Sequence, residues 1–240
     1  MLPYLEQGRL LEHGFELHLR PYDHPNNLVL QQHIEVYSCP SDNALGRMFE
    51  NPFYPWRNSR SNLVVCWGSG IWAPNCPSFS DMFTSNNCRG EQLENDGPFC
   101  VEIPRRLSKI TDGTSNTAMA SEILSGQHDT YDGTPQGSDY RGLWGIAYSG
   151  MGSYMHRDTP NSSVGDALYS THCVPQPEMP CGTPVEDAVL HHAAARSHHP
   201  GGVNVVSIDG HVDFYDDEID ADIWRWLATI EGGEVGVVAK

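Results

Sequence analysis

Two β-prone runs joined by Asp209-Gly210, near the end of the chain, are the feature that most constrains the fold. Residues 203–208 and 211–215 are rich in β-branched and aromatic side chains, and an Asp-Gly pair between such runs is among the strongest short-range signals of a β-hairpin. A type I′ turn needs positive φ at both central residues, which Asp and Gly tolerate. We therefore predict a hairpin closed by a type I′ turn.

The alternation of side chains predicts what each face of this hairpin carries. Successive side chains of a strand point to opposite faces, so Val203 and Val205 are expected on one face, together with Ser207. The second run divides in the same way, with an apolar pair opposite three polar or amphipathic residues: Val212 and Phe214 against His211, Asp213 and Tyr215. The pattern predicts one apolar face and one face that carries His and Asp.

Four short motifs follow one another along the chain. They are Leu-Pro-Tyr-Leu-Glu-Gln at residues 2–7, Tyr-Ser-Cys-Pro-Ser-Asp at 37–42, Ile-Thr-Asp-Gly-Thr-Ser-Asn-Thr at 110–117 with Glu122 after it, and His199 followed after nine intervening residues by Asp209-Gly210. The last spacing resembles the prepilin-type processing-associated C-terminal domain of a large bacterial family of pilin-like proteins of unknown function, and the other motifs agree with that family. The resemblance implies a pilin-like ancestry, in which an N-terminal helix packs on an antiparallel sheet.

The resemblance also implies a segment ahead of the first motif. Members of that family usually carry a prepilin-type leader and a long hydrophobic helix before Leu-Pro-Tyr-Leu-Glu-Gln, whereas this sequence begins at that motif. The leader and the helix are expected either to have been lost or to lie outside the sequence.

The charge balance excludes some partners. Fourteen Lys and Arg stand against 31 Asp and Glu, a formal net charge of −17, so the protein repels phosphate backbones and anionic lipid surfaces. No run approaches the roughly 20 apolar residues that a membrane span requires. We expect no nucleic-acid partner and no membrane contact by this chain. The acidic surface suits an exported protein that meets divalent cations, although acidity also serves solubility.

The spacing of the cysteines favours disulfide bonds. No Cys-x-x-Cys pair, which would indicate a zinc site or a redox motif, occurs in the sequence. Disulfides persist in oxidising compartments, so we expect an extracellular, cell-surface or periplasmic location. We expect at least two bridges, and Cys173 and Cys181 are close enough in sequence to close a local loop. The disulfide candidates are Cys39, Cys66, Cys76, Cys88, Cys100, Cys173 and Cys181.

Together these patterns predict an α+β fold with a mainly antiparallel sheet that contains the C-terminal hairpin, short flanking helices and long disulfide-stapled loops. Further strands are predicted over residues 61–67, 97–103, 117–124 and 143–148. Helices are predicted near the N-terminus, over residues 28–36, and over residues 217–229, where Ile219, Ile223, Trp226 and Leu227 share a face. We expect one domain, residues 1–240, with loop insertions at about 43–95 and 149–187.

A second Asp-Gly pair, Asp112-Gly113, opens a run of side-chain oxygens that ends at Asn116, with Glu122 further on. Clustered hard donors beside an acidic residue suit Ca²⁺, but the ligand spacing of an EF-hand loop is absent. The favoured interpretation is structural, because hydroxyls and an amide can tie down a turn. The structural motif residues are therefore Asp112, Gly113, Asn116, Glu122, His199, Asp209 and Gly210.

Histidines gather around the hairpin, at positions 191, 192, 198, 199 and 211. With carboxylates beside them they form a candidate site for Zn²⁺ or another transition metal, whose ligands would be His199, Asp209, His211 and Asp213. The favoured alternative is structural: the His199 imidazole hydrogen-bonds the backbone of the Asp209-Gly210 turn. Acid–base catalysis is a third interpretation.

These observations predict an exported structural or adhesive pilin-like subunit, with an assembly or recognition role at the cell surface or outside the cell, that associates with itself or with other surface proteins. The sequence carries no nucleophile-elbow or phosphate-loop motif, so catalysis is not expected. Two alternatives stay open. One is a metal-dependent enzyme that uses the His/Asp cluster over residues 191–213, and the other is a polysaccharide-binding module built on Trp56, Trp67 and Trp72.

Overall fold

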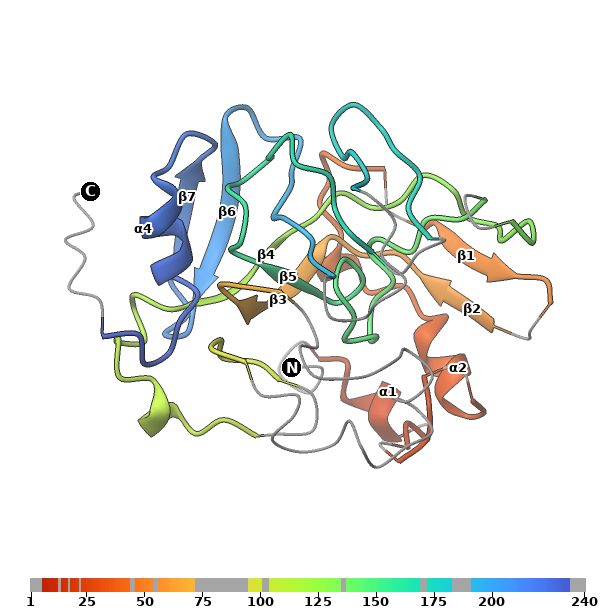
Figure 1. Ribbon diagram of the computed structural model, residues 1–240. Helices are drawn as coiled ribbons and strands as arrows, with labels where there is room; N and C mark the ends of the chain where they lie inside the picture. Colours follow the sequence, from red (N-terminus) through yellow and green to blue (C-terminus); the bar gives the residue numbers. More distant parts are fainter. Residues whose placement is uncertain are drawn as a thin grey trace.

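The computed structural model of the protein confirms the predicted α+β class (Figure 1). It describes residues 6–12, 14–16, 18–21, 23–43, 46–53, 56–71, 95–100, 104–134, 137–168, 172–182 and 191–233. None of the helices in these ranges is long and apolar enough to cross a membrane. The elements, in chain order, are α1 (Gly8–Glu12), α2 (Asn26–Leu30), η2 (Glu35–Tyr37), β1 (Met48–Asn51), β2 (Trp56–Ser59), β3 (Leu63–Gly68), η5 (Leu107–Lys109), β4 (Ala118–Glu122), β5 (Ser153–Met155), β6 (Gly202–Ser207), β7 (Val212–Asp216) and α4 (Ala221–Trp226).

The main sheet has five strands in the order β5-β3-β4-β6-β7, with β7 at one edge (Figure 1). Its strand pairs are antiparallel except β3 with β5, which is parallel. Leu63 of β3 pairs with Glu122 at the end of β4, and β4 pairs in turn with β6. The sheet therefore joins segments that lie far apart in the sequence. A separate antiparallel pair, β1 and β2, lies within the predicted 43–95 insertion.

The predicted hairpin is present as β6 and β7, but its turn is not type I′. Gly210 has a φ of +93°, whereas Asp209 does not take a positive φ. The Gly210 amide donates to the Ser207 carbonyl at 2.9 Å, and the Ser207 amide donates to the His211 carbonyl at 2.9 Å. This is a three-residue connection over 208–210, in which the glycine takes the left-handed position.

The longer turn also reverses the predicted faces of β7. A three-residue loop shifts the register by one, so Val205 pairs with Asp213 and Val206 pairs with Val212. A shift of one residue moves every side chain to the opposite face. Val203 and Val205 are buried as expected, but Val212 and Phe214 lie on the other face and are 58 % and 51 % exposed. The prediction of a single apolar face was therefore wrong for the second strand.

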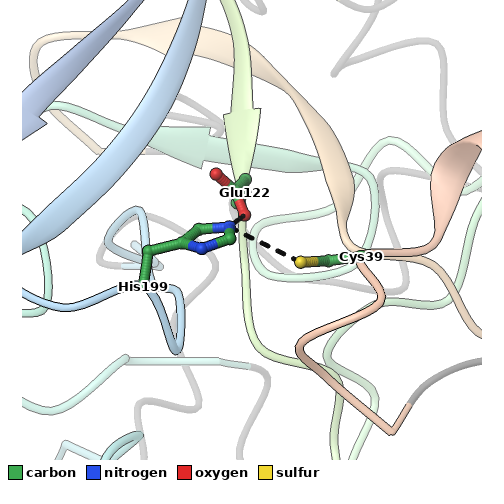
Figure 2. A group of neighbouring side chains, drawn as sticks. All are labelled: Cys39, Glu122 and His199. Atoms are coloured by element: carbon green, nitrogen blue, oxygen red, sulfur yellow. Dashed lines mark hydrogen bonds and ion pairs between the residues drawn. The ribbon is translucent and has the colours of Figure 1, made fainter.

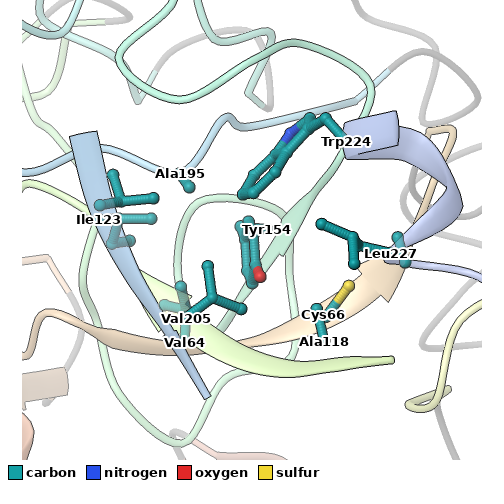
Figure 3. Close-up of a cluster of buried hydrophobic side chains, with 11 residues drawn as sticks. Val64, Cys66, Ala118, Ile123, Tyr154, Ala195, Val205, Trp224 and Leu227 are labelled. Carbon is teal, nitrogen blue, oxygen red and sulfur yellow. The ribbon is translucent and has the colours of Figure 1, made fainter. Parts of the chain in front are cut away.

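The first hydrophobic core lies where α4 packs on the buried face of the sheet (Figure 3). Trp224 is fully buried there and donates its indole N–H to the Asp158 carbonyl at 2.9 Å. Asp220 caps the helix by accepting the amides of Asp222 and Ile223. The predicted apolar face was partly wrong, because Trp226 is 39 % exposed. The helix begins at residue 221 rather than 217, so Ile219 lies outside it and does not mark its buried face, which carries Trp224.

A neutral histidine completes this core. The ring of His156 stacks on Trp224 at 3.6 Å between centroids. Its Nδ1 lies 2.5 Å from the Trp224 carbonyl, which can only accept, so Nδ1 carries the proton and Nε2 accepts from the Tyr154 hydroxyl at 2.9 Å. Burial lowers the pKa of His156 from its ordinary 6.5 to about 3. Burial likewise lowers the pKa of His172 to about 4.

A second core, of aliphatic and aromatic side chains, joins α2, β1 and β2 to residues 140–151. Trp56 takes part in it, with its ring 5.3 Å from Phe49 and 5.4 Å from Tyr140. Trp67 is 2 % exposed, and Trp72 lies outside the described residues. Trp56 and Trp67 therefore do not present their rings as an open platform for a polysaccharide.

Buried arginine–carboxylate pairs hold the long segments together. Asp166 accepts from Arg196 at 3.0 Å and from Arg141 at 3.2 Å, and Arg141 also pairs with Asp139 at 2.6 Å. All four side chains are almost completely buried. These contacts join residue 166, within the predicted 149–187 insertion, to the segment that leads into β6. Disulfides were predicted to have this role.

One predicted disulfide is present in the described part of the chain. Cys173 and Cys181 are bridged, as their spacing suggested. Cys39 and Cys66 carry free thiols. Burial raises the pKa of Cys66 to about 12, so that thiol is unreactive. Cys76 and Cys88 lie outside the described residues, and a second bridge stays a prediction.

The other predicted elements have mixed outcomes. Strands 61–67 and 117–124 are confirmed as β3 and β4, whereas the helix predicted over 28–36 is replaced by α2 and η2. Residues 143–148 form no strand, although Leu143 makes an isolated bridge with Arg60. Residues 97–100 form none either, and 101–103 lie outside the described residues.

The role of Asp166 can be tested by Asp166→Asn, which keeps the shape and removes the charge. The buried Arg196 would lose its carboxylate and Arg141 would keep only that of Asp139, so we expect a loss of about 3–5 kcal/mol in the free energy of unfolding, measured by urea denaturation. Glu50→Gln is the matched control, because Glu50 pairs with Arg57 at the exposed surface and its loss should cost at most about 1 kcal/mol. Equal losses in the two variants would contradict the assigned role.

The buried histidines predict acid sensitivity. In the unfolded chain His156 becomes protonated below about pH 6.5, whereas in the folded protein it stays neutral until about pH 3. Stability should therefore fall as pH falls through this window, by about 1.4 kcal/mol per pH unit for each such histidine. His156→Gln should reduce this slope of unfolding free energy against pH by that amount, while His18→Gln, at an exposed position, should not. An unchanged slope in His156→Gln would refute the buried neutral state.

Candidate functional site

Three of the four sequence motifs meet at one place (Figure 2). Cys39, Glu122 and His199 each offer a metal-ligating atom, and these atoms lie within 4.8 Å of one another. His199 Nε2 is 3.1 Å from Glu122 Oε2 and 3.6 Å from Cys39 Sγ. The fourth motif, residues 2–7, lies mostly outside the described residues. The motifs that are distant in sequence are therefore neighbours in the fold.

The sheet places Glu122 and His199 beside each other. Glu122 ends β4, and its carbonyl accepts the Arg196 amide at 2.8 Å, which aligns the segment before β6 with the end of β4. Ser197 Oγ then accepts the His199 amide at 3.0 Å and donates to the Gly202 carbonyl at 2.7 Å. This tight loop directs the His199 imidazole back toward Glu122.

Asn62 attaches the Cys39 segment to the same end of β4. The Cys39 amide donates to Asn62 Oδ1 at 2.8 Å, and Asn62 Nδ2 donates to the Ile123 carbonyl at 2.9 Å and to Asp42 Oδ2 at 2.5 Å. Asp42 also accepts the Ser125 amide at 2.8 Å. Asn62 is buried and all of its amide contacts serve this junction. Asn62 was not among the residues predicted from sequence.

Asn204 fixes the orientation of the Glu122 carboxylate. Its backbone N–H and its Nδ2 both donate to Glu122 Oε1, at 2.9 and 2.7 Å. One oxygen is therefore occupied, and the other faces His199. Asn204 interrupts the Val-rich run of β6, and that interruption was the available signal that this position serves a polar contact.

The four ligands predicted for a metal fall into two groups. His211 lies between two carboxylates, with Nδ1 2.6 Å from Asp209 Oδ1 and Nε2 2.9 Å from Asp213 Oδ2. The hydrogen bond to Asp209, with the nearby carboxylate charges, raises the pKa of His211. His199 contacts Glu122 and Cys39 instead. The structure thus gives His199 different partners from those expected.

The Asp209-Gly210 turn is held by the 110–117 motif rather than by His199. The Asp209 amide donates to the Thr114 carbonyl at 3.1 Å, and the Ile208 amide donates to the Thr117 carbonyl at 3.0 Å. The predicted hydrogen bond from the His199 imidazole to this turn is replaced by these contacts. Two loops rich in turn-forming residues therefore support one another.

The carboxylate of Asp112 has a structural partner in this region. It accepts the amides of Gly232 and Gly233 at 2.8 and 3.0 Å, and Asn116 Nδ2 donates to the Asp112 carbonyl at 3.1 Å. Gly113 takes a φ of +99°. These contacts agree with a turn that ties down the chain after α4, and they occupy both carboxylate oxygens of Asp112.

The chain also matches the model of a protein family. The model of a family described as "Protein of unknown function (DUF1559)" matches residues 1–222, a range that contains all four motifs. No curated protein and no solved structure matches the chain.

Proposed function

The chain belongs to the family of proteins of unknown function DUF1559, and from that premise we propose that it is an exported, pilin-like structural subunit that associates with copies of itself through strand β7. The observation that carries this proposal is the exposure of Val212 and Phe214 on a strand at the edge of the sheet. The spacing of His199 and Asp209-Gly210, together with the other three motifs, supports the pilin-like relation.

An edge strand can bind another strand through its outer backbone groups. Large apolar side chains on such a strand are usually avoided, because they favour edge-to-edge pairing. Two copies of β7 related by a two-fold axis would pair antiparallel and bring each Phe214 against the other copy. A second copy of the same chain is therefore the occupant that the strand suits.

Charge limits how strongly this pairing can form. Asp213 and Asp216 lie on β7, Asp209 lies in the adjoining turn, and the whole chain has a net charge of −17. Like charges repel at low ionic strength, and dissolved salt or divalent cations screen them. Association should therefore strengthen as the salt concentration rises, unlike association that depends on salt bridges.

The proposed location outside the cytoplasm is supported by the bridge between Cys173 and Cys181. Disulfides of this kind persist in extracellular and periplasmic compartments and are rare where thiols are kept reduced. An assembly at the cell surface would also meet the salt and divalent cations that screen the acidic charge.

Sedimentation velocity over a wide range of protein concentration, at about 0.05 M and about 0.5 M sodium chloride, tests the assembly. We expect a dimer whose fraction grows with protein concentration and with salt. Val212→Ser and Phe214→Ser should each weaken association by about tenfold or more, since each removes buried apolar area from the contact.

Leu107→Ser is the control for that experiment, because Leu107 is 69 % exposed but lies in η5, outside the sheet. It should leave association unchanged. A parent protein that stays monomeric under all conditions, or an equal effect of Leu107→Ser, would refute assembly through β7.

The location has its own test. Thiol alkylation and mass spectrometry of protein taken from its native compartment should show Cys173 and Cys181 protected until a reductant is added. Alkylation of both residues without reductant would contradict export and would leave the assembly test unaffected.

A further inference from the structure

We propose that Cys39, Glu122 and His199 bind one divalent transition-metal ion, with zinc the best match. This site shares only His199 with the metal ligands expected from sequence, and it is independent of assembly through β7. Thiolate, imidazole and carboxylate are the three side-chain ligand types of protein zinc sites. The three atoms come from different segments, and they converge within 4.8 Å.

Two of the three separations between the ligand atoms are close to those around a tetrahedral zinc ion. Bonds of about 2.0–2.3 Å at tetrahedral angles place neighbouring ligand atoms about 3.3–3.6 Å apart. Cys39 Sγ and His199 Nε2 are 3.6 Å apart, and His199 Nε2 and Glu122 Oε2 are 3.1 Å apart. The third pair, Cys39 Sγ and the Glu122 carboxylate, lies within 4.8 Å, and these two atoms would move toward each other to hold the ion.

The same distances disfavour a nucleophilic cysteine. A Cys-His-carboxylate relay uses both imidazole nitrogens, one for the thiol and the other for the carboxylate. Here Cys39 and Glu122 both approach Nε2 of His199. A single nitrogen cannot accept the thiol proton and also donate a hydrogen bond to the carboxylate. Metal binding, in contrast, requires that the three ligand atoms lie around one point.

The surrounding hydrogen bonds hold the ligands in place before an ion arrives. Asn204 occupies Glu122 Oε1 and leaves Oε2 directed at His199. Asn62 fixes the backbone of Cys39, and Ser197 fixes that of His199. Such outer contacts orient metal ligands and typically raise metal affinity about 10–100-fold.

Charge and exposure indicate which ion would bind and how. A thiolate and a carboxylate balance the charge of a divalent ion, with His199 neutral, and the soft thiolate disfavours Ca²⁺ and Mg²⁺. The side chains of Glu122 and His199 are 13 % and 29 % exposed, so the ion can enter from solvent. Three protein ligands leave a fourth position for water, as in catalytic zinc sites.

Titration of the metal-free whole chain with cobalt(II), followed by displacement with zinc(II), tests the site. We expect one equivalent of cobalt to bind, with the thiolate-to-cobalt absorption band and the visible spectrum of a tetrahedral ion, and zinc to abolish both. Cys39→Ser should lose the thiolate band. His199→Ala and Glu122→Gln should bind cobalt at least about tenfold more weakly.

His211→Gln is the matched control, because His211 is paired with Asp209 and Asp213 and should leave binding unchanged. Circular dichroism and thermal unfolding of each metal-free variant establish that it is folded; Glu122→Gln keeps the oxygen that Asn204 contacts. The proposal is overturned if the parent shows no saturable thiolate band, if the band persists in Cys39→Ser, or if His211→Gln abolishes it.

Discussion

The shared carboxylate of Asp166 is the interaction on which the arrangement of the long segments depends. It binds the guanidinium groups of Arg141 and Arg196 in the protein interior. Burial of a carboxylate or a guanidinium group without a partner of opposite charge would be strongly destabilising. Arg196 has a second role, because its backbone amide bonds to Glu122, the last residue of β4. The buried ion pair therefore fixes where the chain turns toward β6, three residues before His199. A candidate site at the surface is positioned by charges in the core.

The elements whose signals are local could be predicted from the sequence. The hairpin, β3, β4 and the Cys173–Cys181 bridge are each specified by neighbouring residues. The register of β7 could not be predicted, because one further residue in the turn decides which face Val212 and Phe214 occupy. The buried arginines were missed because arginine is usually exposed, and nothing in the sequence marks the partner that makes its burial tolerable.

The candidate site was predicted residue by residue but not as a site. His199 was predicted both as a structural motif residue and as a metal ligand, Glu122 was predicted as a structural motif residue, and Cys39 was predicted as a disulfide candidate. Their meeting follows from the strand order β3-β4-β6, which depends on pairings between distant segments and has no local signature. Asn62 and Asn204, which orient the site, are single polar residues next to or within strands. Their contacts with the site residues form only when the strands pair.

The contacts between the 110–117 motif and the chain after α4 have a mechanical consequence. The amide of Thr111 bonds to the Ile230 carbonyl, that of Ala118 bonds to the Leu227 carbonyl, and Asp112 binds the amides of Gly232 and Gly233. A pulling force applied beyond residue 233 would pass through these bonds into β4, an interior strand of the main sheet. Load would then act on several hydrogen bonds together instead of peeling β7 from the edge one bond at a time. In the proposed surface assembly, a subunit under tension would resist extension through this connection.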